Sequence, residues 1–330
     1  MRRDYLLRRT GFALAALVAV LTAAFAVIEL TANPTVAQVA ADASRQAAAE
    51  NANATAQTRQ VERAVREYRI ENGLNRPLPV RYVDWMWSVF TLDWGTSRLP
   101  GRAGARSVRS LVADGLQTTA LWVVPAVVCS SCVSTVAGLA GVTRRTTRRS
   151  RAVSAATYLL YGLPNFWLAL VALPPVVVWA APESWLTVGD RLLFGPGVAA
   201  LAVAGSLIAV QSRYVRSETG ARLDRAFVTV VRAKGGGRWT VGRHVLRHAG
   251  VTLTSLFVAD YLGVLVVEVF VLETALGIDG VGALGIEAIQ RQDLPTVLGI
   301  TFVLAAVGVG LNLLADIAHG LLDPRTATEE

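Results

Sequence analysis

The amino-acid sequence predicts an all-helical membrane protein with six transmembrane helices and both chain ends in the cytoplasm. The first observation is the distribution of apolar residues. The 330-residue chain is 53% hydrophobic and 17% charged, with a mean hydropathy of +0.45, and its apolar residues fall in long blocks typical of membrane-spanning helices. The second observation is that arginines concentrate at the ends of these blocks, as expected for loops retained in the cytoplasm. This placement favours a membrane lipid environment and argues against a nucleic-acid partner.

The first expected span is Gly11–Leu30, which follows four arginines close to the start of the chain. A cleaved signal peptide is the alternative, but its apolar core is usually shorter and ends in a small-residue cleavage site. Because further apolar blocks follow, we predict a retained helix with its N-terminus inside.

An external region is expected over residues 31–115. Its first part, an insert at about 36–58, is rich in Ala, Asn and Gln and lacks apolar periodicity. We therefore predict a flexible or loosely helical insert. Arg59–Glu71 predicts an amphipathic helix, because apolar residues recur at helical spacing. These residues are Val61, Ala64, Val65 and Tyr68.

Five further apolar blocks complete the predicted topology, with every cytoplasmic connection basic. The expected spans are Leu116–Val142, Ala152–Ala181, Gly197–Val210 extended by residues 192–194, Gly250–Leu272 and Val297–Leu322.

The connection between the fourth and fifth spans is the most basic part of the chain. We call residues 211–249 the basic connection and expect it in the cytoplasm. From Arg213 onward it holds eight arginines and Lys234, against Glu218 and Asp224. Arginines at helical spacing predict a short helix with Arg222, Arg225 and Arg232 on one side. The glycine run 235–237 should end that helix, and a second basic helix should lead back into the membrane.

No enzyme active site, cofactor site or metal site is predicted. A phosphate-binding loop ends in Gly-Lys followed by Ser or Thr, but the only lysine, Lys234, stands between Ala233 and Gly235. ATP hydrolysis, if it drives this protein, must occur on another polypeptide. His244 and His248 have the spacing of a helical metal pair but lie among arginines, which favours a solvated helix. The pair of cysteines at 129 and 132 is interpreted as helix-packing residues.

Two acidic residues lie within the fifth expected span. An aspartate at the centre of a bilayer costs about 2.5 to 3.5 kcal/mol on insertion scales, so Asp260 and Glu268 should face protein or water. They could line a solute path at an interface with a second membrane subunit, or they could make interhelical hydrogen bonds; both interpretations stay open. Asn312, Asp316 and His319 share one helix face and are expected to serve in packing and hydrogen bonding.

Several motifs resemble one family of transporters. Arg232-Ala233-Lys234-Gly235, followed by RHVLRHA at 243–249, resembles the cytoplasmic loop of ABC importer permeases of the dipeptide/oligopeptide/nickel family. The resemblance extends to four further segments in chain order. These are GLNRPLPVRY at 73–82, LPNFW at 163–167, ETALGIDGVG at 273–282 and LLADIAHGLLDPR at 313–325.

The resemblance implies a single permease domain over residues 1–330 with the type I ABC importer fold. It further implies that the basic connection contains a coupling helix that docks on an ATPase, with Arg232, Ala233, Lys234, Gly235, Arg243 and Arg247 as contact residues. The implied partners are a second permease subunit in a heterodimer, two ATP-binding subunits and an extracellular solute-binding protein. The implied solutes are di- and oligopeptides, or nickel chelates. The chain departs from the family in its insert, in the triple glycine and in lacking a proline near 251–254.

The alternative from another class is a secondary transporter or channel that works alone. It predicts charged sites at mid-membrane, for which Asp260 and Glu268 are candidates, together with internal repeats. The sequence shows no such repeat. A membrane-anchored sensor would need a soluble signalling domain, and no segment is large enough for one.

Overall fold

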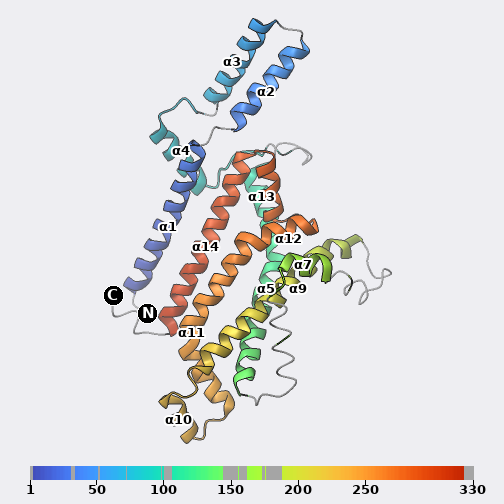
Figure 1. The fold of residues 1–330 in the computed structure, drawn as a ribbon. Helices are drawn as coiled ribbons and strands as arrows, with labels where there is room; N and C mark the ends of the chain where they lie inside the picture. Colours follow the sequence, from blue (N-terminus) through green and yellow to red (C-terminus); the bar gives the residue numbers. More distant parts are fainter. Residues whose placement is uncertain are drawn as a thin grey trace. The chain divides into compact units, whose positions relative to one another are not determined.

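A computed structural model of the protein (Figure 1) describes residues 3–30, 34–50, 53–71, 73–97, 99, 106–143, 155, 162–172, 175 and 188–322. Throughout these residues the regular structure is helical, apart from an isolated bridge between Thr96 and Ser107. The α-helices are α1 (Arg3–Leu30), α2 (Pro34–Ala49), α3 (Ala54–Glu71), α4 (Leu78–Phe90), α5 (Val108–Thr143), α7 (Asn165–Trp167), α9 (Val188–Gly220), α10 (Ala226–Ala233), α11 (Arg238–Gly263), α12 (Val269–Leu276), α13 (Val281–Gln290) and α14 (Leu294–Leu322). Two π-helical segments, η1 (Leu168–Ala172) and η3 (Val264–Glu268), continue α7 and α11.

Five segments of the described chain are long and apolar enough to cross a membrane. They are Tyr5–Val27, Val108–Ala140, Phe194–Gly220, Arg238–Leu276 and Leu294–Leu322. They overlap the first, second, fourth, fifth and sixth expected spans, which confirms the all-helical membrane class. The expected third span, Ala152–Ala181, lies mostly outside the described residues, so the number of six stays a prediction.

The fourth span is longer than the sequence predicted. We expected it to end at Val210, but α9 continues to Gly220. Gln211, Ser212 and Thr219 are polar, yet each is at most 4% exposed because this part of α9 packs inside the protein. Hydropathy alone could not reveal that burial, since polar residues lower the apolar score of the segment. The basic connection therefore begins with helix, and its non-helical part starts at Ala221.

The insert is a helical hairpin, where the sequence predicted a flexible or loosely helical segment. Helices α2 and α3 run side by side in Figure 1, with Ala43 and Ala47 buried between them. Gln57 Nε2 donates a hydrogen bond to Ser44 Oγ across the hairpin at 2.9 Å. The start of α3 is capped, since Asn53 Oδ1 accepts a hydrogen bond from the backbone N–H of Ala56. The amphipathic helix predicted over Arg59–Glu71 is confirmed as the second part of α3.

The chain forms two compact units. One comprises Ala15–Ala113 and Gly285–Ala305; the other comprises Met1–Leu14, Asp114–Leu284 and Ala306–Glu330. The former contains the α2–α3 hairpin and an aromatic cluster, in which the Phe25 ring lies 5.3 Å from both Tyr82 and Trp85. The latter contains every residue that the sequence singled out as a candidate site.

Close packing of α5 against α9 depends on a small residue at Gly138. A Cβ atom at this position would lie 2.5 Å from Val215 Cβ and 3.0 Å from the backbone oxygen of Ser212. Small residues at such crossings let helix backbones approach closely inside a membrane. Val215 is itself fully buried, in a cluster with Ala249 and Leu253 of α11, so α5, α9 and α11 pack around one point.

We expect Gly138→Ala to lower the free energy of unfolding by about 1–3 kcal/mol, because the added methyl group overpacks the α5–α9 contact. Thermal unfolding of the purified protein in mild detergent measures the effect. Gly205→Ala in α9 is the control, since a Cβ there meets nothing within 4 Å and the gain in helix propensity is the same. Equal melting temperatures for the two variants would contradict the packing argument.

Candidate functional site

The end of the basic connection is a compact pair of helices. Val228 of α10 packs against Val241 and Val245 of α11, and all three are at most 5% exposed. Phe227 and Val231 are among the half-buried residues that pack against this core. The ring of Phe227 also lies 4.5 Å from that of His248. The short helix α10 is therefore held against the first turns of α11 by its own apolar face.

Glycines 235 and 236 set the turn between these helices. Gly236 N–H donates to the Val231 carbonyl, and Gly235 N–H to the Arg232 carbonyl, both at 2.9 Å. This pair of bonds is the Schellman arrangement that ends many helices. Gly235 has φ of +79°, which side chains disfavour, and a Cβ on Gly236 would lie 2.7 Å from the Val231 oxygen. The predicted helix, glycine break and second basic helix are thus confirmed.

The predicted grouping of three arginines on α10 is wrong in part. Helix α10 begins at Ala226, so Arg222 and Arg225 precede it and only Arg232 belongs to it. Arg222 instead closes the end of α9, where its Nη1 lies 2.6 Å from Glu218 Oε2. Arg222 therefore pairs with α9 and does not belong to a helical face of α10. The spacing of residues along the sequence could not show this.

All six residues predicted to contact an ATPase are exposed. Arg232, Ala233, Lys234 and Gly235 come together at the end of α10 and in the turn, whereas Arg243 and Arg247 lie one helical turn apart on α11. Two apolar side chains missed by the sequence reasoning accompany them: Trp239 is 78% exposed and Val230 is 52% exposed. Exposed tryptophan and arginine side chains are enriched at the residues that dominate protein–protein binding.

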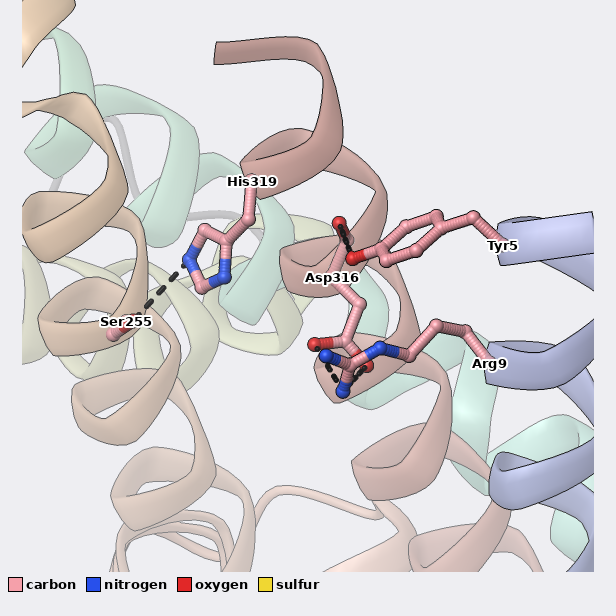
Figure 2. Close-up of polar contacts among 5 residues, drawn as sticks. All are labelled: Tyr5, Arg9, Ser255, Asp316 and His319. Carbon is pink, nitrogen blue, oxygen red and sulfur yellow. Dashed lines mark hydrogen bonds and ion pairs between the residues drawn. The ribbon is translucent and has the colours of Figure 1, made fainter. Parts of the chain in front are cut away.

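A polar cluster joins the end of α14 to α1 and α11 (Figure 2). Arg9 Nη1 lies 3.4 Å from each carboxylate oxygen of Asp316, and Tyr5 donates a hydrogen bond of 3.1 Å to the Asp316 backbone oxygen. On the other side of α14, His319 Nε2 lies 3.2 Å from Ser255 Oγ of α11. The hydrogen-bonding role predicted for Asp316 and His319 is confirmed, although the two side chains, expected on one helix face, contact different helices, α1 and α11. Because α11 also carries α10, contacts run continuously from α10 through α11 and α14 to α1.

Asp260 and Glu268 line one cavity of about 500 Å³. Its walls come from three segments: the residues around α7, the middle of α9, and α11 with η3. Glu268 accepts a hydrogen bond of 3.0 Å from Asn165 Nδ2, so the interhelical hydrogen bond considered above is present at this residue. Gln211 lies beside the Asp260 carboxylate, but the enclosed Oδ2 atom of Asp260 has no hydrogen-bond partner among the described residues.

Polar side chains also join α5 to the helices next to this cavity. Ser131 and Tyr261 hydroxyls lie 2.5 Å apart, joining α5 to α11. Ser134 donates a hydrogen bond of 3.3 Å to Gln211 Oε1, joining α5 to α9. These bonds fix the three helices by polar contacts inside an apolar segment.

Glu273 is a buried residue to which the sequence reasoning assigned no role. It is 0% exposed, and its Oε1 accepts hydrogen bonds from Thr119 Oγ1 at 2.6 Å and Trp122 Nε1 at 3.1 Å. Its Oε2 accepts from the backbone N–H groups of Gly282 and Ala283 at 2.7 and 3.3 Å. The carboxylate thus binds the N-terminus of α13, where helix N–H groups favour an anion. The glycines on either side of Val281, at the start of α13, were the feature of the sequence that could have indicated this close contact with Glu273.

The start of α13 also lies very close to the first residues of α12. A Cβ on Gly282 would lie 2.6 Å from the Val269 carbonyl oxygen, and a Cβ on Gly280 would collide with the Glu273 carboxylate. Gly277, with φ of +65°, ends α12, and α13 follows.

Potential metal ligands do not cluster in the described part of the chain, where no group of three or more His, Cys, Asp or Glu side chains is found. Cys129 and Cys132 are free and exposed on α5.

Comparison with known proteins assigns the chain to a family. Residues 133–328 match the model of the binding-protein-dependent transport system inner membrane component. A protein of Brucella ovis, provisionally named a peptide permease protein, is 27% identical over 266 residues, covering 78% of this chain and 82% of its own length. The metal-staphylopine import system permease protein CntB of Staphylococcus aureus is 26% identical over 255 residues, covering 77% and 79%.

The apolar helices and their internal polar bonds define a multi-pass membrane protein of the plasma membrane. The chain belongs to the family of binding-protein-dependent transport system inner membrane components, the permease subunits of ABC importers.

We expect Glu273→Ala to lower the free energy of unfolding by about 3 kcal/mol or more, because it leaves several buried donors without an acceptor. Glu273→Gln should have a smaller effect, since one oxygen remains. Thermal unfolding in detergent measures both.

Asp279→Ala is the matched control, because Asp279 is an exposed carboxylate in the same turn. If Glu273→Ala were as stable as this control, the carboxylate would not hold α13 in place.

Proposed function

We propose that the protein is a permease subunit of an ATP-driven importer of di- and oligopeptides, with six spans and cytoplasmic chain ends. It would form a heterodimer with a second permease, bind two ATP-hydrolysing subunits in the cytoplasm, and receive solute from an extracellular binding protein. The peptide assignment is supported by the name of the Brucella ovis relative. The name of the Staphylococcus aureus relative, a metal-staphylopine import system permease protein, gives a second solute class.

The single observation that carries this proposal is the continuity of α11. One uninterrupted α-helix, Arg238–Gly263, bears Arg243 and Arg247 near its start and Asp260 near its end. At 1.5 Å per residue, Arg243 and Asp260 are about 26 Å apart along the helix axis. A subunit that grips the exposed basic end therefore acts directly on a helix that lines the cavity.

The length of the fifth span supports a basic end outside the hydrocarbon. Arg238–Leu276 contains 39 residues, whereas about 20 residues suffice to cross a bilayer. The arginines at its start favour the side of the membrane where positive loops are retained. In this arrangement α10, the turn and the first turns of α11 protrude into the cytoplasm.

The polar cluster at the end of α14 would transmit a displacement of α11 to other helices. Displacement of α11 reaches α14 through the Ser255–His319 contact and then α1 through Asp316 and Arg9. Motion of this kind is a rigid-body shift of packed helices.

We expect the double substitution Arg232→Ala with Lys234→Ala to reduce ATP-dependent peptide uptake at least tenfold, because it removes two charges from the surface that binds the ATPase. Uptake is measured in cells that carry the substitutions in the native transporter. Mild-detergent purification of the same protein shows whether an ATPase subunit stays bound.

Arg63→Ala with Arg66→Ala is the matched control, since it removes two exposed arginines from α3. Normal uptake and normal ATPase retention by the first variant would contradict the assigned surface. Uptake that persists without ATP, with no ATPase bound to the unaltered protein, would instead favour the stand-alone transporter.

A further inference from the structure

The charged side chains described around the cavity, Asp260 and Glu268, are both acidic. Both of these carboxylates line it, and among the described residues that line it there is no Lys, Arg or His. Within the described residues, neither carboxylate forms an ion pair with a basic side chain. A charge held in an apolar span is stabilised by an opposite charge or by hydrogen bonds. The described part of the chain therefore places two carboxylates in this cavity and no cation beside them.

The helix geometry brings the two carboxylates to one side. In a regular α-helix the eight steps from Asp260 to Glu268 would leave them about 80° apart around the axis. The intervening segment, η3 (Val264–Glu268), is π-helical, and its wider turns advance each residue by a smaller angle. This difference moves Glu268 toward the face of Asp260, which agrees with their presence in the same cavity.

A second π-helical segment lies next to the partner of Glu268. Asn165, which donates the hydrogen bond to Glu268, begins the short helix α7, and η1 (Leu168–Ala172) follows α7 directly. π-helical turns within α-helices are rare and occur frequently at functional sites. Two of them therefore adjoin the walls of this one cavity.

The remaining walls fit an organic group better than a bare ion. Leu163, Leu207, Val210 and Val267 contribute apolar surface, and Ser206 and Tyr214 contribute hydroxyl groups. A volume of about 500 Å³ lies within the range of about 300–1,000 Å³ usual for small-molecule sites. An ammonium or guanidinium group on an aliphatic chain would pair with the carboxylates and bury its stem against the apolar walls.

We propose that this cavity is a cation-selective section of the solute path, which binds an ammonium or guanidinium group of the transported solute. The inference rests on the proposed function and adds a charge requirement to it. Asp260 contributes an oxygen that has no hydrogen-bond partner among the described residues, and Glu268 contributes a carboxylate oriented by Asn165. Solutes with a net negative centre are repelled by the same two groups.

The test uses the complete transporter in cells and three labelled tripeptides of similar size: Ala-Lys-Ala, Ala-Gln-Ala and Ala-Glu-Ala. The unaltered transporter is compared with Asp260→Asn, Glu268→Gln and the double variant, and uptake rate and KM are measured for each peptide. The extracellular binding protein is the same in every strain. A change in the ratio between peptides therefore reports on the membrane-embedded site.

We expect the unaltered transporter to prefer the Lys peptide over the Glu peptide, and the double variant to reduce that preference about tenfold, the effect of losing one favourable charge pair. Asp42→Asn, on the exposed surface of α2, is the control and should keep the preference. Membrane content of each variant is checked by immunoblot. The single variants serve where the double variant does not assemble.

ATP-dependent uptake with a peptide preference that is absent, or that is unchanged in the variants, would overturn the cation requirement and leave the importer assignment intact. Absent or ATP-independent uptake in the unaltered strain would instead overturn the proposed function, and the cation requirement with it.

Discussion

The constraint on which this structure depends is that hydrocarbon offers no hydrogen bonds. A polar group placed within an apolar helix is therefore costly unless it finds a partner inside the protein or lines a cavity. Four donors surround Glu273, Asn165 binds Glu268, and Ser131 meets Tyr261. Each of these bonds joins one helical segment to another, and those to Thr119, Trp122 and Asn165 and between Ser131 and Tyr261 join segments distant in sequence. Because such bonds are costly to break in an apolar environment, they determine which helices stay fixed to each other when the protein works.

Apolar and polar contacts therefore have different roles in the compact unit that contains the candidate sites. Apolar packing joins α10 to α11 and α5 to α9, and small residues such as Gly138 allow the helices to approach. Polar contacts then act at defined points. Asp316 and His319 join one end of α14 to α1 and α11, and Glu273 of α12 binds the start of α13. Apolar contact is weakly directional, whereas the hydrogen bonds fix orientation. The combination gives a set of helices that can move together without losing their register.

The sequence was informative wherever a local rule applies. Hydropathy located the spans, and the glycines at 235 and 236 marked the turn after α10, because helix ends follow local steric rules. It failed where partners are distant: Glu273 binds residues of α5 about 150 positions earlier in the chain, and polar residues of α9 are buried by other helices. The α2–α3 hairpin was missed because its core is made of alanines, which give little periodic signal, although Asn53 carries a recognisable cap. For Asp260 and Glu268 the sequence predicted that both would face protein or water, and their role in transport stays a prediction.

The π-helical segment η3 has a consequence for the whole fifth span. Each residue added to or removed from a helix rotates everything beyond it by about 100°, and a π-turn absorbs part of such a rotation. By its wider turns η3 lets Asp260 face the cavity while Glu273, thirteen positions later, faces α5 and α13. A strictly α-helical version of the same sequence would be out of phase at one of these two places. The π-helical segment thus lets Asp260 and Glu273 both face their contacts, which a uniform α-helix of this sequence could not do.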